Sequence, residues 1–461
     1  MRPPALQLPI VLLLSAALAG CGKSLPAEGQ GRGVSVTTVP GTNQLAASGL
    51  TTKNTTRLGG ANPVADAAAV AIATYPGLTP ATRPQAVVLV NDRDWPSALA
   101  AAALASSPLR APLLYSAGSS LPAISKQALA ALKPTGAARL GGAQVIEVGQ
   151  IAAPAGYRRL TLSGPPAALP AQVERLVART HGGTPHRVIV VGAAGPPALA
   201  MPAAGLAAES GAPILPVDAG GVPRATRRVL VRLHRPAIYA VGPPAAVSDT
   251  VLAELARFGS VRRIYPAPSA NGASGPGTNG IDPVDNAIAV ARFSDGPFGW
   301  GVDQPGHGLV FARASRPLDA PAAAPLSANG DYAPLLLLEH ANQVPPVLGE
   351  YLRDIQPAYG AAPEYQPVRG AYNHGWLIGD DEALTPTVQA ELDAMLEISP
   401  QGSTSSANPT APASTEPSAA APSSAEPSTS TPSAGQPSTA APSPSEPPAT
   451  GPASEPTSPT P

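Results

Sequence analysis

The stretch AVVLVNDRDWPSALAAAALASSPLRAPLLY, residues Ala86–Tyr115, decides the fold. It reads as an apolar run (Ala86–Val90), a polar turn, an alanine-rich segment (Ser97–Ala105) and a second apolar run entered through Ala111-Pro112-Leu113-Leu114. Strands without polar alternation are buried on both faces, which is typical of parallel sheets covered by helices. The stretch therefore predicts a strand–helix–strand unit of an α/β fold.

The same order of parts occurs twice more along the chain. The second copy comprises Val188–Val191, Ala198–Ala208 and Ala212-Pro213-Ile214-Leu215, and the third comprises Leu309–Phe311, Leu318–Leu326 and Ala333-Pro334-Leu335-Leu336. The Ala-Pro pairs lie 101 residues (213 − 112) and 121 residues (334 − 213) apart. Self-similarity at such a spacing indicates structural repeats. The fold class that we expect is three tandem small α/β layers with mostly parallel sheets.

Each copy also has elements before and after this unit. Asn62 is a good N-cap and Pro63 suits the first helical position, which predicts a helix over Pro63–Thr74. Asp282-Pro283 repeats that start in the third copy. The predicted closing strands, each followed by glycine, are Ala137–Leu140, Ala237–Val241 and Gly375–Ile378.

The first 21 residues have the features of a targeting segment. Arg2 precedes an apolar run, Leu8–Leu18, that is short for a membrane span. The run ends in Leu18-Ala19-Gly20-Cys21, which resembles the bacterial lipoprotein lipobox. That resemblance implies cleavage before Cys21, the chain's single cysteine, and attachment of lipid to it. We therefore expect a membrane-anchored, extracytoplasmic protein.

Changes in composition divide the chain further. Residues 401–461 are mostly Pro, Ser, Thr and Ala, with four Glu as their only charged side chains, which predicts a disordered, extended tail. The predicted organisation is a lipoprotein signal peptide (1–21), a flexible linker (22–55), repeat 1 (56–159), repeat 2 (160–262), repeat 3 (263–400) and the tail (401–461).

The repeats resemble the cell wall-binding repeat 2 family, which occurs as three tandem copies in surface proteins of Gram-positive bacteria. Arg57-Leu58-Gly59-Gly60-Ala61-Asn62 is similar to the opening motif of that family. Ser97-Ala98-Leu99-Ala100-Ala101 and Asp319-Ala320-Pro321-Ala322-Ala323 resemble its helix motif, and the three Ala-Pro strands resemble its next segment. The positions of the family's Arg-Tyr pair hold Pro63 and Val64 here. The resemblance implies a pseudo-threefold module that binds anionic wall polymers non-covalently.

The carboxyl ends of the strands are the natural place for such a ligand, because ligands of parallel sheets bind there. A polyanion, whether a teichoic-acid-like polymer or another anionic glycan, favours guanidinium groups. The polymer-binding candidates are Arg57, Asn62, Asp92, Arg93, Arg313 and Arg316.

Other function classes have little support in the sequence. No nucleophile elbow, P-loop, zinc motif or cysteine-based metal spacing occurs, so we expect no enzyme activity, metal or cofactor. The net charge is −1, and about +3 without the tail's four Glu, which argues against nucleic acid as a partner. A lipid-anchored extracellular protein that binds a solute or sugar remains an alternative. It would have two lobes joined by hinge strands around one cleft.

Overall fold

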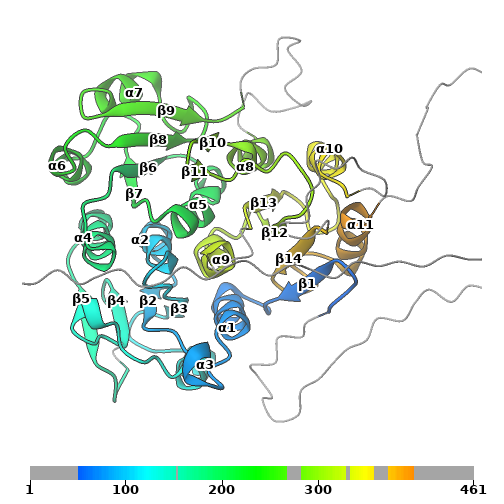
Figure 1. Ribbon diagram of the computed structural model, residues 1–461, viewed down its shortest axis with the longest axis horizontal. Helices are drawn as coiled ribbons and strands as arrows, with labels where there is room; N and C mark the ends of the chain where they lie inside the picture. Colours follow the sequence, from blue (N-terminus) through cyan, green and yellow to red (C-terminus); the bar gives the residue numbers. More distant parts are fainter. Residues whose placement is uncertain (1–49, 152–153, 267–281, 329–332, 358–371, 399–461) are drawn as a thin grey trace, which may run out of the picture. The chain divides into compact units, whose positions relative to one another are not determined.

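The computed structural model of the chain describes residues 50–151, 154–266, 282–328, 333–357 and 372–398 (Figure 1). These residues form a mixed α/β fold with mostly parallel sheets. The predicted signal peptide with Cys21, almost all of the predicted linker, and the predicted tail lie outside the described residues. No helix within the described ranges is both long and apolar enough to cross a bilayer.

Three four-stranded sheets, parallel throughout, share one pattern of strand order. The first, β3-β2-β4-β5, contains β2 (Val87–Asn91), β3 (Leu113–Ser116), β4 (Val145–Val148) and β5 (Arg159–Leu162). The second, β7-β6-β8-β9, contains β6 (Arg187–Gly192), β7 (Ile214–Val217), β8 (Ala237–Val241) and β9 (Ser260–Ile264). The third, β13-β12-β14-β1, contains β1 (Thr55–Leu58), β12 (Gly308–Arg313), β13 (Leu335–Leu338) and β14 (His374–Ile378).

The helices also fall into groups according to their place in chain order relative to the strands of the three sheets. The opening helices are α1 (Pro63–Thr74), α4 (Leu169–His181) and α8 (Pro283–Arg292). The alanine-rich helices are α2 (Trp95–Ala101) with the 3-10 turn η2 (Ala102–Ala105), α5 (Pro202–Ser210) and α9 (Asp319–Ala328). Those after the Ala-Pro strands are α3 (Ala123–Leu132), α6 (Arg224–Arg232) and α10 (Pro346–Asp354). The remaining helices are α7 (Asp249–Leu255) and α11 (Pro386–Leu396). A small antiparallel pair, β10 (Ser294–Asp295) and β11 (Phe298–Gly299), follows α8.

Several expectations from the sequence are confirmed. The helix predicted over Pro63–Thr74 is α1, and the Asn62 side chain accepts hydrogen bonds from its first turn. The apolar runs of the three copies form β2, β6 and β12, each paired with the strand that follows an Ala-Pro pair. The backbone N–H at the first position of a helix has no partner within the helix, so proline, which lacks this group, is favoured there. The Asn62-Pro63 pair is therefore a clear sequence signal for the start of α1.

The two faces of each sheet contact different apolar clusters. In β2, Val88 and Val90 belong to a large core shared by all three sheets, whereas Val87 and Leu89 pack against α1 and α3. The same alternation occurs in β6 and β12. Because successive side chains of a strand point to opposite faces, every central strand is buried on both sides. This burial accounts for the unbroken apolar runs in the sequence.

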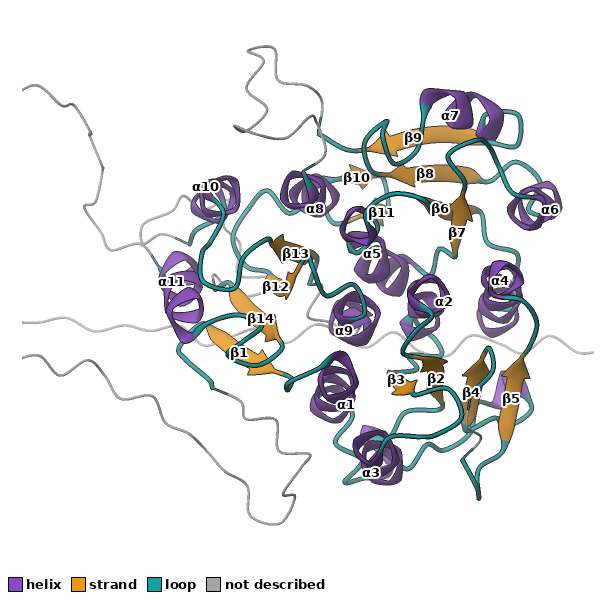
Figure 2. Cartoon of the chain, turned by 180° about the vertical axis from the view of Figure 1, so that it is seen from behind, coloured by secondary structure: helices purple, strands orange, loops and turns teal. Residues whose placement is uncertain are grey.

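Small side chains let the alanine-rich helices approach one another in the shared core. Helices α5 and α9 pack together, and both contact η2 (Figure 2). A Cβ atom on Gly205 of α5 would lie 2.7 Å from Oγ of Ser327 on α9, so a larger residue does not fit there. The alanine content of these helices is therefore a packing requirement.

The first strand of the chain completes the last sheet. Strand β1 pairs with β14, with Arg57 opposite Leu377 and Leu58 opposite Ile378. Strands β5 and β9 take the equivalent edge position in the first and second sheets. In chain order, the next described α-helix after each of these edge strands is an opening helix: α1, α4 or α8. The chain thus returns to its own start when it forms the third sheet.

The strand predicted at Ala137–Leu140 is wrong. Residues Ala138–Leu140 form a short 3-10 turn, and the strand of that repeat is β4, eight residues later. Gly141 and Gly142 adopt φ of +69° and +77°, which turns the chain sharply and lets Ala137 bridge to Ala143. Only the following run Val-Ile-Glu-Val is extended and apolar enough to pair with β2.

Candidate functional site

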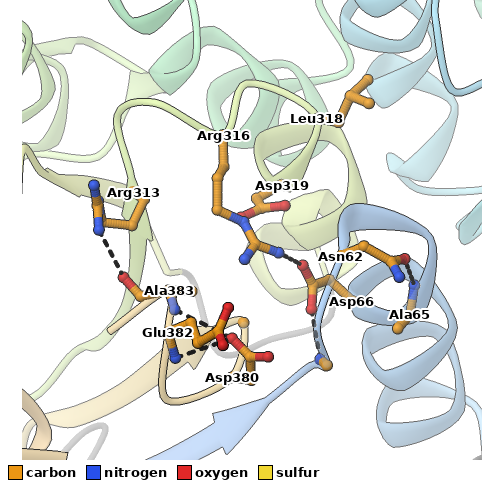
Figure 3. A network of polar contacts seen from close by, with 12 residues as sticks. Asn62, Ala65, Asp66, Arg313, Arg316, Leu318, Asp319, Asp380, Glu382 and Ala383 are labelled. Carbon is orange, nitrogen blue, oxygen red and sulfur yellow. Dashed lines mark hydrogen bonds and ion pairs between the residues drawn. The ribbon is translucent and has the colours of Figure 1, made fainter. Parts of the chain in front are cut away.

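Four of the six polymer-binding candidates lie at the junction of the third sheet with α1. Arg57 is the second-last residue of β1, which pairs with β14. Asn62 caps α1, Arg313 is the last residue of β12, and Arg316 follows that strand (Figure 3). Asp92 and Arg93 instead follow β2 of the first sheet. The fold therefore brings together elements from the beginning and the end of the module.

Arg57 is held inside the protein. Its side chain is 2% exposed, and it donates from Nη1 to the carbonyl oxygens of Gly379 (3.2 Å) and Asp380 (2.7 Å) and from Nε to Oε1 of Gln389 (3.1 Å). Burial lowers its pKa, and the neighbouring carboxylates of Asp381 and Asp380 oppose this shift. Arg57 fastens β1 to the end of β14 and to α11, and its guanidinium presents almost no surface to a ligand.

Asn62 is occupied by the helix that it caps. Its Oδ1 accepts hydrogen bonds from the backbone N–H groups of Val64 and Ala65, both at 3.1 Å. Asp282 caps α8 in the same way, with Oδ1 accepting from Val284 at 2.7 Å. These contacts satisfy amides that have no partner within a helix. Asn62 is thus the N-cap of α1, as its position before Pro63 in the sequence predicts.

Arg316 lies between two buried aspartates. It forms an ion pair with Oδ2 of Asp66 from α1, and its Nε lies 2.8 Å from Oδ2 of Asp319 at the start of α9 (Figure 3). Both aspartates are 0% exposed, while the Arg316 side chain is 18% exposed. Oδ1 of Asp66 also accepts a hydrogen bond from the N–H of Gly60 at 2.6 Å. This cluster connects α1 with the segment that follows β12 and with the start of α9.

The carboxyl groups of Asp66 and Asp319 share the single guanidinium of Arg316. One positive charge cannot balance two negative charges, so ionisation of both carboxyl groups is unfavourable. Burial raises the pKa of Asp66 to about 6, against the opposing effects of Gly60 and Arg316. Burial, together with the charge of Asp66, raises the pKa of Asp319 well above its usual value. Both carboxyl groups therefore hold a proton more readily than a solvated aspartate does, and Arg316 opposes this effect at each of them.

Close backbone contacts at this junction require glycine. Gly59 has a φ of +144°, and a Cβ atom there would lie 2.5 Å from the backbone nitrogen of Gly379. Gly379 itself has a φ of +105°. The ends of β1 and β14 thus approach too closely for side chains, which explains why glycines follow both strands.

Arg313 and the two candidates of the first sheet are more accessible. Arg313 is half-buried, with Nη1 donating to the carbonyl oxygen of Ala383 at 3.3 Å. Arg93 is exposed, and its backbone N–H donates to Oδ1 of Asn91. Asp92 is half-buried, and its Oδ1 has no hydrogen-bond partner among the described residues. Of the four candidate arginines, only Arg93 is largely open to solvent.

Tyr115 connects the first sheet to this junction and was not a candidate. Its hydroxyl donates to the carbonyl oxygen of Leu318 at 2.5 Å, although the ring belongs to β3. Burial raises its pKa well above the usual value, and the charges of Asp319, Asp66 and Asp92 add to this effect. A tyrosine in an apolar strand is an ordinary core residue by sequence, so only the fold reveals its polar role.

Within the described residues, no group of three or more His, Cys, Asp or Glu side chains is placed to hold a metal ion. The Asp380-Asp381-Glu382 run makes a local turn, in which Oδ1 of Asp380 accepts from the N–H groups of Glu382 and Ala383, each at 3.1 Å. The polar groups of this junction therefore mainly make structural contacts, and Arg313 and Arg316 remain partly exposed.

Comparison with known proteins identifies the fold. No family model and no curated protein sequence matches the chain. Among solved structures it is similar to Cwp8 from Clostridium difficile, with a TM-score of 0.54 and 18% identity over 75% of this chain and 53% of that one. It is also similar to Cwp6 from Clostridium difficile, with a TM-score of 0.57 and 18% identity over 74% of this chain and 48% of that one. This chain spans about half the length of each of those proteins and shares their fold over that part.

Proposed function

We propose that the chain is a bacterial surface lipoprotein whose three repeats form a pseudo-threefold module that binds anionic cell-wall polymers non-covalently. The observation that carries this proposal is the agreement between two independent likenesses. The repeats resemble the cell wall-binding repeat 2 family in their motifs, and the folded part resembles Cwp8 and Cwp6 in three dimensions. The lipobox at Cys21 is consistent with a place outside the cytoplasm.

The contacts between repeats support the threefold arrangement. The opening helices α1, α4 and α8 pack against α9, α2 and α5, so each repeat contacts the next around a ring. The fourth residue of α1 is Asp66, which binds Arg316 after β12. The fourth residue of α8 is Asn286, and its Nδ2 donates to the carbonyl oxygen of Leu199 after β6 at 2.8 Å. Equivalent positions thus make polar contacts with the same part of a neighbouring repeat.

The alternative of a two-lobed binder of a solute or sugar has less support. Apart from the small β10–β11 pair, the described strands form three four-stranded sheets of one strand order rather than two lobes. We therefore place the function in the repeated module as a whole.

Co-sedimentation with purified cell walls tests the proposal. The full chain with Cys21→Ser, which prevents lipidation, should sediment with intact walls and remain in solution with walls stripped of anionic polymers. Equal sedimentation with both preparations would refute polymer binding. A protein that stays in solution with both would refute wall attachment altogether.

A further inference from the structure

The near-zero net charge of the chain hides a strong asymmetry between the repeats. Residues 56–159 contain nine basic and four acidic side chains, and residues 160–262 contain ten and five, so each range carries +5. Residues 263–400 contain six basic and sixteen acidic side chains and carry −10. A polyanion is attracted by the first two repeats and repelled by the third. The candidates Arg313 and Arg316 belong to the acidic repeat.

The basic charge of repeat 2 is concentrated on two neighbouring helices. Helix α6 has four arginines and no acidic residue, and α4 lies beside it, joined through the ion pair of Arg232 with Glu174 (Figures 1 and 2). The exposed sides carry Arg175 and Arg179 on α4 and Arg224 and Arg228 on α6, each pair one turn apart. We call these four side chains the arginine face.

The arginine face has unused binding capacity. None of its four side chains has an ion pair or a side-chain hydrogen bond within the described residues, whereas Arg227 and Arg232 of the same helix are paired with Glu254 and Glu174. Arg139 of repeat 1 is also exposed and lies against Gly182 at the end of α4. The exposed acidic residue that lies nearest to Arg224 in the sequence is Asp218, before the start of α6.

The fold does not require these arginines. The helices at the same place in the other repeats are α3, with Lys126 as its single charge, and α10, with Glu350, Arg353 and Asp354. In α6, Arg224 and Arg228 repel each other, and Arg224 lies at the helix N-terminus, where a positive charge is unfavourable. A bound anion would remove both penalties.

We propose that the arginine face binds the anionic wall polymer, with the acidic third repeat turned away from it. This inference rests on the proposed function and assigns the polymer a surface other than the strand ends. Two rows of guanidinium groups suit an extended chain of phosphate or carboxylate groups. The apolar side of α6, with Val229 and Leu230, is buried in the core, so the helix cannot insert into a membrane as surface-seeking helices do.

A charge-matched pair of variants tests the inference. R175Q/R224Q/R228Q removes three charges from the arginine face, and K126Q/R257Q/R353Q removes three exposed charges elsewhere. In the full chain with Cys21→Ser, the first variant should bind intact walls about tenfold more weakly at low salt, because three exposed charge contacts are lost. The second should bind like the parent. The difference should shrink at high salt, where screening weakens the parent as well.

The outcomes separate this inference from the proposed function. If the parent and both variants bind walls equally well, the arginine face is not the site, although wall binding itself stands. If the parent does not bind walls, the proposed function fails. Vesicles of anionic lipid form a further arm: binding of the parent to vesicles but not to walls, lost in R175Q/R224Q/R228Q, would reassign the face to the membrane and overturn the inference.

Discussion

Arg316, which follows β12, forms an ion pair with Asp66 of α1, 250 residues earlier in the chain. Strand β1, which precedes α1, completes the third sheet, so this contact and strand β1 both fasten the start of the module to that sheet. Buried ion pairs add little stability compared with apolar packing, but removing one partner is costly. We therefore expect the loss of either partner to destabilise this junction.

Loss of Arg316 should destabilise the module strongly. Arg316→Met leaves two buried carboxyl groups without a cation, and we expect a loss of about 3–5 kcal/mol in the free energy of unfolding. Asp66→Asn should cost less, because the third repeat has Asn286 at the same helix position. Urea unfolding of both variants measures the difference. An Arg316→Met protein as stable as the wild type would show that the cluster does not hold the repeats together.

Stability should depend on pH through Asp66. Its pKa is about 6 in the folded protein and near 3.8 when unperturbed, so the folded state binds more protons between these values. The free energy of unfolding must then fall as pH rises from about 4 to 6, with a contribution from this group of up to about 3 kcal/mol.

The matched control for this prediction is Asp66→Asn, which cannot titrate. Urea unfolding at several pH values should show a weaker decline for Asp66→Asn than for the wild type over that window. Identical profiles for the two proteins would contradict the assignment of the raised pKa to Asp66.

Arg57 should matter for stability and not for binding. Arg57→Met leaves two backbone carbonyls and the Gln389 side chain without their buried donor, and we expect a loss of about 3 kcal/mol. Arg93→Met, at an exposed position, should change stability by less than about 0.5 kcal/mol. Under conditions in which the Arg57→Met protein is folded, it should bind walls like the wild type. Weaker wall binding by a fully folded Arg57→Met protein would return this residue to the binding site.

Membrane attachment should depend on Cys21. Cys21→Ser removes the site of lipidation, and two lipid attachments are needed for stable anchoring. Fractionation of cells after digestion of the wall should find the wild type with membranes and the variant in the soluble fraction. Retention of the variant with membranes would argue against a lipoprotein.

Local sequence signals predicted the central elements because their causes are local. Asn62-Pro63 determines the start of α1 through contacts within the first turn of that helix. The apolar run before Asn91 is typical of a strand that is covered on both faces. The edge strand β5 (Arg-Leu-Thr-Leu) has no such signal, since its alternating pattern suits an exposed edge or a loop equally. Helices α3 and α6 begin after proline without a side-chain cap, which left them without a recognisable start.

The candidate site was less predictable than the fold. Asp66 is surrounded in sequence by alanines, and nothing local indicates that its partner follows β12. The sequence suggests that the arginines at the strand ends bind a ligand, yet Arg57 joins β1 to the end of β14 and Arg316 joins α1 to the segment after β12. These contacts join residues that are far apart in the sequence, so they cannot be predicted from any single segment of the chain.

The most direct test of the central claim is competition by the polymer itself. Anionic polymer released from purified walls is added in increasing amounts to the full chain with Cys21→Ser already bound to intact walls, and the protein left on the walls is measured. The account predicts that the soluble polymer displaces the protein in a dose-dependent manner, whereas a neutral glycan at the same concentration does not. Protein that stays on the walls at saturating anionic polymer, or that the neutral glycan displaces equally well, would contradict it.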